Sequence, residues 1–263
     1  MAWWNFGKKK VGLVLGGGGA RGLAHIGVLR ILEKHKIPIH YLVGVSSGSM
    51  IGAFFAAGMP AAEIEEIGLR ISWGKLIKFA FFRPGLVSGE ALGNFIKRHI
   101  GDIEFKDLKI PFATVAADVR SGEQVVFKHG NVAQAVAASS AFPGFFAPEH
   151  VGKYVLVDGA LSDNLPVDVA KEMGANFVIA SDVVPSKPIS YIPKDAMQVF
   201  GRSLDIMLHN LSKENRKKAD ILIEPTIGED VWHLDLHKAK HLIAAGEIAT
   251  HKLIDRIKFL VES

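Results

Sequence analysis

A sharp turn from a strand into a helix is the feature of this sequence that most limits its fold. The pentapeptide Gly44-Val45-Ser46-Ser47-Gly48 follows the apolar run at residues 41–43 and precedes a small apolar segment, residues 49–58. These neighbours predict a strand before the turn and, after it, a buried helix that ends at a glycine. Glycine fits beside such a turn because the backbone leaves little room for a Cβ. The pattern is typical of a nucleophile elbow with an exposed serine hydroxyl, although an ordinary Gly/Ser turn shares it.

A second junction of this kind lies near the N-terminus. An apolar strand, Lys10–Leu15, leads into Gly16-Gly17-Gly18-Gly19-Ala20-Arg21-Gly22, and apolar spacing predicts a helix from Leu23 to about Lys36. Such a glycine-rich loop frees several N–H groups to converge on an anion at a helix N-terminus. The anion could be a dinucleotide pyrophosphate, since Gly17-x-Gly19-x-x-Gly22 fits that fingerprint, or the oxyanion of a tetrahedral acyl intermediate.

The dinucleotide interpretation requires an acidic residue about 20 positions further on, to hold the ribose hydroxyls. Residues 39–44 contain no carboxylate, and the nearest acid, Glu33, lies inside the predicted first helix. No Gly-Lys-Ser/Thr ends the glycine run, so the loop is not a P-loop. The sequence therefore favours the oxyanion.

A carboxylate closes a later strand. Asp158 ends the apolar run at residues 154–158 and precedes Gly159 and Ala160. At the carboxyl end of a strand in a parallel α/β sheet it would face the ligand-binding edge, although an aspartate there can equally be a turn residue. The histidines beyond it lie in predicted helices or in a segment without a loop glycine, and we expect them to be surface or capping residues: His209, His233, His237, His241 and His251. A serine–aspartate dyad without histidine is the simpler prediction.

Four motifs in order now carry a family resemblance: Gly17 to Gly22, Gly44 to Gly48, Ala138-Ser139-Ser140-Ala141-Phe142-Pro143, and Asp158-Gly159-Ala160 with Asn164-x-Pro166. Over roughly residues 10–174 the chain resembles the patatin-like phospholipases. The resemblance implies that Ser46 is the nucleophile, that Asp158 is its base, and that the loop forms the oxyanion hole and substrate-binding positions (Gly17, Gly18, Gly19, Arg21 and Gly22). It also implies that the elbow and motif positions Gly44, Gly48, Gly159 and Ala160 support the site.

A buried aspartate can serve as the base only under restrictive conditions. Its ordinary pKa, near 4, lies far below that of a serine hydroxyl, so Asp158 would be a weak base in water. A dry site with preorganised oxyanion donors, each worth about two to three decades in rate, can compensate. We therefore predict that activity falls on acidification and that no histidine is obligatory.

Length and alternation predict the architecture. The chain has 263 residues, 49% of them hydrophobic, enough for one α/β core. Short apolar runs alternate with helical stretches, which predicts a three-layer α/β/α fold with a mostly parallel, patatin-like central sheet. We expect one acyl hydrolase domain, residues 10–263, behind an N-terminal arm, residues 1–9. The predicted strands are Lys10–Leu15, His40–Val45, Phe112–Ala117, Gln124–Lys128, Tyr154–Asp158, Asn176–Asp182 and Asp220–Glu224.

Two segments could meet a lipid surface. Trp3, Trp4 and Phe6 beside three lysines resemble an interfacial anchor, and residues 71–87, including Trp73–Leu86, have the composition of an amphipathic lid. The alternatives are an arm packed on its own domain and a loop buried over the core. No apolar run is long enough to span a bilayer, and no cleavable signal is visible. With no cysteine and a net charge of +4, the chain fits a cytoplasmic protein that could bind membranes peripherally.

No metal-binding motif, cofactor motif or nucleic-acid-binding motif is present. The expected activity is a serine lipid acyl hydrolase acting on phospholipid, lysophospholipid or another acyl ester. Two alternatives remain open: an acyltransferase that uses the same acyl-enzyme, and a lipid-sensing regulatory module in which ester hydrolysis is incidental.

Overall fold

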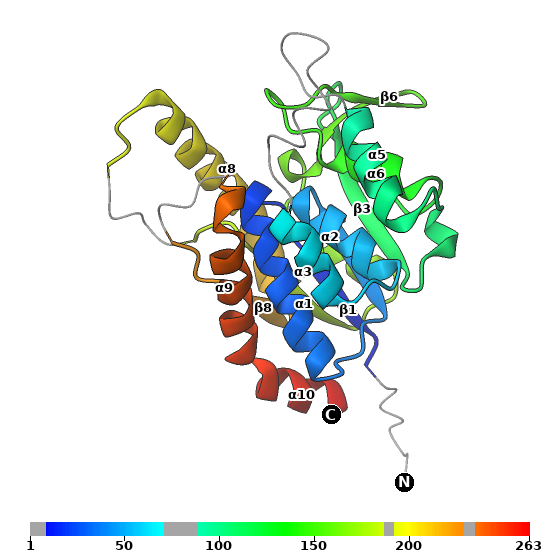
Figure 1. Cartoon of the computed structure of the whole chain (residues 1–263), viewed down its shortest axis with the longest axis vertical. Coiled ribbons are helices and arrows are strands. Elements are labelled where there is room, and N and C mark those ends of the chain that lie inside the picture. Colours follow the sequence, from blue (N-terminus) through cyan, green and yellow to red (C-terminus); the bar gives the residue numbers. More distant parts are fainter. Residues whose placement is uncertain (1–8, 71–88, 187–191, 229–234) are drawn as a thin grey trace.

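The computed structural model describes residues 9–70, 89–186, 192–228 and 235–263. The predicted anchor around Trp3 and Trp4, the predicted lid at residues 71–87 and His233 lie outside these ranges. Figure 1 gives the course of the chain.

A single twisted sheet runs through the described part of the molecule (Figure 1). Its strands follow the order β5-β6-β3-β2-β1-β7-β8, with β4 also paired to β3. The neighbours β3, β2, β1, β7 and β8 are parallel, whereas β4, β5 and β6 pair antiparallel. The bounds are β1 Val11–Leu15, β2 Tyr41–Val45, β3 Phe112–Asp118, β4 Gln124–Phe127, β5 Glu149–Val151, β6 Tyr154–Asp158, β7 Phe177–Ser181 and β8 Ile221–Ile223.

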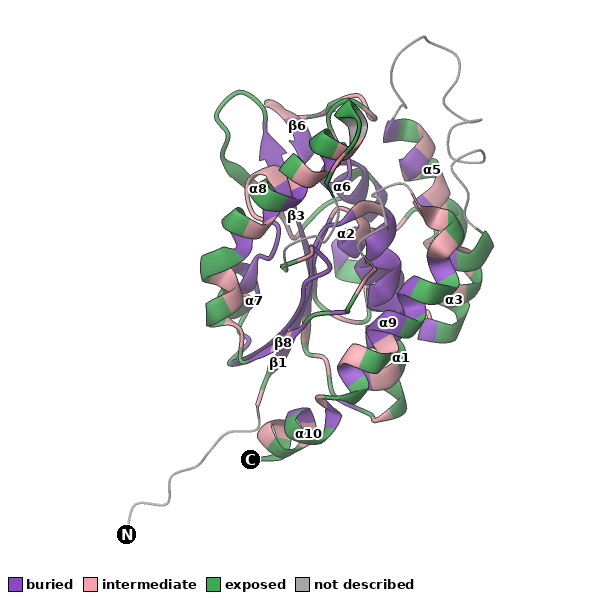
Figure 2. Ribbon diagram, turned by 90° about the vertical axis from the view of Figure 1, so that its left-hand side faces the viewer, coloured by how far each residue is buried: buried purple, intermediate pink, exposed green. Residues whose placement is uncertain are grey.

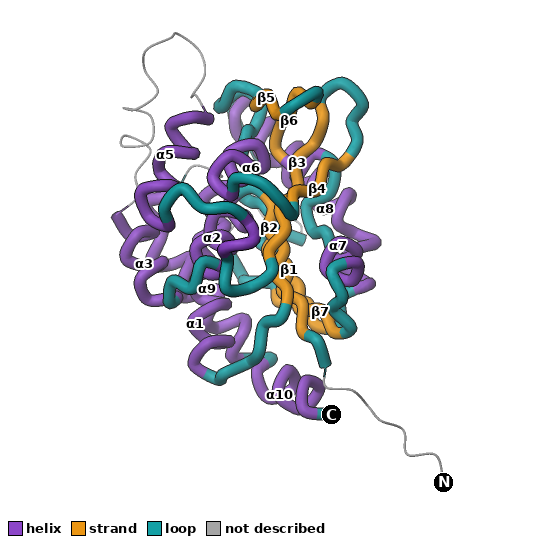
Figure 3. The backbone as a smooth tube through the Cα atoms, turned by 90° about the vertical axis from the view of Figure 1, so that its right-hand side faces the viewer, coloured by secondary structure: helices purple, strands orange, loops and turns teal. Residues whose placement is uncertain are grey.

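Helices cover both faces of this sheet, so the prediction of a three-layer α/β/α fold is confirmed (Figures 2 and 3). One face carries α1 Ala24–Lys34, α2 Ser47–Ala56, α3 Ala61–Arg70, α5 Gly89–Ile100, α6 Val132–Ser139 and α9 Ala239–His251. The other carries α7 Val167–Glu172 and α8 Ala196–Lys218, and α10 Ile254–Glu262 closes the chain. Alternate residues of β1 point into the two layers: Leu13 and Leu15 pack toward the α1 side, Val14 toward the α7 side.

The helices α1 and α9 touch backbone to backbone. A Cβ added to Gly27 of α1 would lie 2.0 Å from the carbonyl oxygen of Ile243, and one on Gly246 of α9 would lie 1.9 Å from that of Ala24. No real Cβ approaches a backbone atom that closely, so glycine is required at both positions. The C-terminal helix α9 is thereby fastened to the first helix of the fold.

The position of β6 corrects one prediction. Asp158 does end a strand, but β6 is antiparallel to β3, not part of the parallel set. Because β4 occupies one edge of β3, both β2 and β6 must use the other edge, which they approach from opposite directions. There Val45 pairs with Val115 and Asp158 with Ala116. The ends of β2 and β6 therefore meet at adjacent positions.

Most predicted element boundaries agree with the structure to within two residues, with three differences. The strand β5 was not predicted, because its three residues carry no apolar alternation. The first helix is preceded by one 3₁₀ turn, Gly19–Leu23, since the glycine loop tightens before α1 begins. The helical stretch predicted around His241 and His251 is α9, and a second helix, α10, follows it after Lys252 and Leu253.

Candidate active site

Ser46 lies at the turn between β2 and α2, in a backbone conformation that few side-chain-bearing residues adopt. Its φ is 53° and its ψ is −124°; among the described residues, only Lys36 is another non-glycine residue with positive φ. Such a conformation costs about 1–3 kcal/mol and persists only where the surroundings impose it. The Ser46 N–H donates to the hydroxyl of Ser139, 2.9 Å away.

The backbone around Ser46 is packed without space for side chains on its glycines. A Cβ on Gly44 would lie 2.5 Å from the Cα of Ser49, and one on Gly48 would lie 2.2 Å from the carbonyl oxygen of Leu15. These contacts lock the elbow against β1 and against its own helix. A side chain at either position would therefore displace the backbone of the turn.

Asp158 faces Ser46 from the end of β6. Its Oδ2 accepts a hydrogen bond from Ser46 Oγ at 2.6 Å, and its Oδ1 accepts one from the Ala160 N–H at 2.9 Å. The carboxylate is 1% exposed. Burial raises its pKa to about 6, while the bonds from Ser46 and Ala160 act in the opposite direction. A buried carboxylate of raised pKa in contact with a strained serine is the arrangement expected of a nucleophile and its base.

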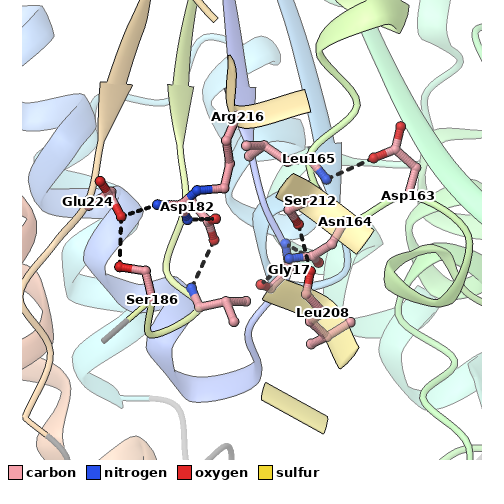
Figure 4. Close-up of polar contacts among 11 residues, drawn as sticks. Gly17, Asp163, Asn164, Leu165, Asp182, Ser186, Leu208, Ser212, Arg216 and Glu224 are labelled. Carbon is pink, nitrogen blue, oxygen red and sulfur yellow. Dashed lines mark hydrogen bonds and ion pairs between the residues drawn. The ribbon is translucent and has the colours of Figure 1, made fainter. Parts of the chain in front are cut away.

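The glycine-rich loop runs beside this pair. A Cβ on Gly17 would lie 3.1 Å from the Cβ of Ser46. The Gly17 N–H donates to Asn164 Oδ1 at 3.0 Å, and Asn164 Nδ2 donates back to the Gly17 carbonyl at 3.3 Å (Figure 4). Among the described residues the N–H groups of Gly18 and Gly19 have no acceptor. The amide of Gly17 is therefore engaged by Asn164, and those of Gly18 and Gly19 remain. The oxyanion-hole role of the three glycines stays a prediction.

A buried histidine that the sequence argument did not consider supports the same loop. His25, in α1, is fully buried, with Nε2 2.8 Å from the Gly16 carbonyl oxygen and Nδ1 3.0 Å from Ser181 Oγ. Burial lowers its pKa to about 4, against the raising effect of the Gly16 contact. The ring is therefore neutral near pH 7. Because a carbonyl can only accept, Nε2–H donates to Gly16 and Nδ1 accepts from Ser181.

Arg21 and Gly22 take supporting positions. The buried guanidinium of Arg21 makes two hydrogen bonds to the carboxylate of Asp205 in α8, at 2.5 and 3.2 Å. A Cβ on Gly22 would lie 2.2 Å from Ser47 Oγ, so Gly22 packs against the start of α2. Both residues thus help to hold the loop in place. Their predicted contact with substrate stays a prediction.

Gly159 and Ala160 follow Asp158 directly and contact it or β3. A Cβ on Gly159 would lie 2.0 Å from the Val115 carbonyl oxygen, so the chain passes directly against β3 after Asp158. This close passage brings the Ala160 N–H to the carboxylate. Ala160 itself is buried.

No histidine in the described part of the chain bonds to Ser46 or Asp158. His237, His241 and His251 are exposed, and His209 is half-buried in α8. Over the same described ranges, no cluster of His, Asp or Glu is suited to hold a metal ion, and none of the helices there combines the length and apolar character that crossing a bilayer requires.

Known proteins resemble this chain in sequence and in fold. The family model for patatin-like phospholipases matches residues 13–171. The mouse "Patatin-like phospholipase domain-containing protein 6" is 34% identical over 183 residues, which are 66% of this chain and 13% of that protein. An uncharacterized NTE family protein of Mycobacterium tuberculosis is 35% identical over 191 residues, 70% of this chain and 33% of its own length. The chain thus spans a third or less of these relatives.

Solved structures share the fold at low sequence identity. VipD from Legionella pneumophila superposes with a TM-score of 0.65 at 15% identity, covering 95% of this chain and 67% of that one. The type III effector protein ExoU gives a TM-score of 0.54 at 14% identity, covering 95% and 54%. These structures show the fold alone. The match to the family model over more than half of the chain shows that the chain belongs to the patatin-like phospholipase family.

Proposed function

We propose that this member of the patatin-like phospholipase family is a serine lipid acyl hydrolase, with Ser46 as nucleophile and Asp158 as its base. The observation that carries the proposal is the 2.6 Å hydrogen bond from Ser46 Oγ to the buried Asp158 carboxylate, made at a strained turn beside unpaired loop amides. The substrate class is an acyl ester of phospholipid or lysophospholipid type, in keeping with the family.

The proposed reaction begins with attack of Ser46 Oγ on the ester carbonyl carbon, while its proton passes to Asp158 Oδ2. The oxyanion accepts hydrogen bonds from the N–H groups of Gly18 and Gly19. Collapse of this intermediate breaks the bond to the alcohol, which leaves with the proton from Asp158. Water, deprotonated by the same carboxylate, then attacks the acyl-enzyme and releases the fatty acid with Ser46 restored.

Two features of the environment favour an aspartate in this role. Burial brings the pKa of Asp158 to about 6, closer to the operating pH than an exposed carboxylate would be. Its Oδ1 is engaged by Ala160, which orients Oδ2 toward Ser46. The pKa of Asp158 still lies far below that of a serine hydroxyl. The oxyanion donors compensate for this difference, because each contributes about two to three decades in rate.

The test combines fluorophosphonate labelling with identification of the fatty acids released from phospholipid and lysophospholipid vesicles. We expect wild type to label stoichiometrically and release fatty acid, Ser46→Ala to do neither, and Asp158→Asn to label at least about 100-fold more slowly. Ser121→Ala is the matched control, because Ser121 also donates to an aspartate, Asp118, away from the glycine loop. That variant should behave as wild type.

Each other outcome has a defined meaning. Labelling that survives in Ser46→Ala would overturn the nucleophile assignment. Labelling of wild type without any lipid turnover would favour a lipid-sensing module over a hydrolase. Transfer of the acyl group to an added alcohol in preference to water would make the protein an acyltransferase with the same acyl-enzyme.

A further inference from the structure

The helix α8 turns polar side chains inward and apolar side chains outward, unlike an ordinary surface helix. The residues it buries recur every three or four positions: Gly201, Asp205, Leu208 and Ser212. Two of these side chains, Asp205 and Ser212, are polar. Asp205 holds the buried Arg21 of the glycine-rich loop. A surface helix normally buries its apolar stripe, whereas two of the four residues that the described part of α8 buries are polar.

The C-terminal part of α8 is held in the same way. Arg216 bonds to buried Asp182 at 2.5 Å and also to Glu224, and Asn215 donates to Asp163 at 3.0 Å. Figure 4 shows Arg216 reaching Asp182 and Glu224, beside the Asn164–Gly17 contact of the loop. Directed polar contacts therefore fix which face of α8 turns inward.

The outward face carries the apolar side chains. Five large hydrophobic residues of α8 are between 44% and 50% exposed: Val199, Phe200, Ile206, Met207 and Leu211. Their spacing of one, seven, eight and twelve positions puts them on one side of a 3.6-residue helix, together with the exposed Ser203 and Asn210. We call these five residues the α8 stripe.

We propose that the α8 stripe is a docking surface for a lipid bilayer, with α8 lying in the headgroup region. The choice of a bilayer as occupant rests on the proposed function, since acyl esters of the proposed class reside there. Lysines flank the stripe, Lys194 before it and Lys213 and Lys217 after it, with Asp195 and Glu214 as the nearby acids. An apolar stripe bordered by lysines is typical of helices that lie on anionic membranes.

A second copy of the chain fits the stripe less well. Five side chains, each about half exposed, offer roughly 400 Å², about half of the 800 Å² that one partner of a stable complex buries. A bilayer, unlike a protein partner, needs no complementary shape. Binding to it therefore does not require the five apolar side chains to form a continuous surface, and Ser203 and Asn210 can lie between them. A bilayer on this face would lie one helix diameter, about 10 Å, from the Arg21 side of the glycine loop.

The test measures sedimentation with phosphatidylcholine vesicles, with and without about a third phosphatidylglycerol, in a Ser46→Ala background so that the lipid stays intact. We expect the triple variant Phe200→Ser, Ile206→Ser, Met207→Ser to partition at least about tenfold more weakly than its parent. The matched control replaces three hydrophobic residues that are 56–71% exposed elsewhere: Val119→Ser, Ile248→Ser and Phe259→Ser. The control should bind within about twofold of the parent.

A second measurement excludes misfolding as the cause of weak binding. With Ser46 restored, the triple variant should hydrolyse a water-soluble p-nitrophenyl ester at the wild-type rate and unfold at a similar temperature. If the triple variant fails this control, the single variant Phe200→Ser takes its place in the sedimentation assay, where about a threefold loss is expected. Lys213→Gln with Lys217→Gln should weaken binding to the anionic vesicles only.

Three results would overturn the proposal: no binding by the parent, equal binding by parent and stripe variant, or a dimer that the stripe variant converts to monomer with vesicle binding unchanged. The last would assign the stripe to a second copy. Stripe-dependent binding without any fatty acid release from active protein would leave the docking surface standing and remove the proposed activity. If the active protein released fatty acid from vesicles equally well with and without the stripe, the proposed activity would stand and the docking surface would be refuted.

Discussion

The two halves of the site are held by different kinds of contact. On the elbow side, Ser46 is fixed by backbone packing, because Gly44 and Gly48 lie within van der Waals distance of other backbone atoms. On the loop side, the glycine run is fixed by buried polar side chains: Asn164 on Gly17, His25 on Gly16, and the Arg21–Asp205 pair.

This difference separates what must stay constant from what can be adjusted. Backbone packing tolerates no added atom, so a change at the elbow is expected to affect folding and chemistry together. A polar tie can be removed one side chain at a time, so changes at the loop are expected to lower the rate while the fold survives. Four measurements, ordered by expected effect, test this contrast.

The largest effect is expected at the elbow. Gly48→Ala places a Cβ 2.2 Å from the Leu15 carbonyl oxygen, and we expect it to lower the free energy of unfolding by about 3 kcal/mol or more, with loss of activity. Gly93→Ala is the control, since its Cβ would meet nothing closer than 4.0 Å and alanine should stabilise α5 by up to about 1 kcal/mol. Urea unfolding measures both. Equal stability of Gly48→Ala and wild type would refute backbone packing as the constraint.

Next comes the loop. Asn164→Ala removes the acceptor of the Gly17 N–H, and we expect kcat on a soluble ester to fall about 100-fold because the Gly18 and Gly19 donors move. Asn131→Ala provides the comparison: Asn131 accepts from the Gln134 N–H at the start of α6, and its loss should cost about 1 kcal/mol of stability without changing kcat. Were kcat of Asn164→Ala to match that of Asn131→Ala, Asn164 would be structural only.

Acid should destabilise the loop side through His25. Its folded pKa, about 4, lies below its ordinary 6.5, so the unfolded chain binds the proton first and stability is lost as pH falls through this range. The unfolding free energy of wild type relative to His25→Gln should fall by about 2 kcal/mol between pH 7 and pH 5. The glutamine can still donate to Gly16 but does not titrate.

Asp158 has the opposite sign, because its folded pKa is raised and the folded state gains stability as pH falls. That contribution is common to wild type and His25→Gln, so it cancels in their difference. His241→Gln, a histidine replacement at an exposed site, is the control for the substitution itself. A difference that stays constant with pH would place His25 in water or in a charged state, against its burial.

The smallest effect is expected for the dependence of kcat on pH at the acid end, which reports on Asp158. In the proposed mechanism Asp158 must be deprotonated to accept the serine proton. Because burial raises its pKa to about 6, we expect kcat to fall tenfold for each pH unit below about 6. A profile of kcat against pH on a soluble ester measures this. A kcat that stays constant down to pH 5, or one that falls a hundredfold for each pH unit, would contradict a single carboxylate base.

The contrast between the two halves also explains which residues could be predicted from the sequence. Ser46 and its glycines sit in one pentapeptide, where turn geometry dictates residue type locally. The loop ties join residues far apart in the chain: Asn164 is 147 positions from Gly17, and Asp205 is 184 positions from Arg21. No local pattern indicates such pairs, so the sequence does not predict the contact of Asn164 with Gly17 or that of Asp205 with Arg21.

His25 and β6 were missed or misplaced for a similar reason. His25 occupies a helix face that is otherwise apolar, and a search for bases downstream of Asp158 does not reach it. The run at residues 154–158 predicts a strand, but strand direction depends on its neighbours. A polar residue one turn after a glycine loop, within an apolar helix, is the local signal that could have pointed to His25.

The tie between α1 and α9 bears on how this protein could be divided. The family match ends at residue 171, yet β7 pairs along the whole of β1, and Gly27 and Gly246 bring α9 into backbone contact with α1. A fragment that ended at residue 171 would expose the edge of β1 that pairs with β7, and it would leave α1 without the packing of α9. Residues 172–263, about a third of the chain, therefore complete the packing of the first part. We expect them to serve better as a separate fragment in complementation than to be dispensable.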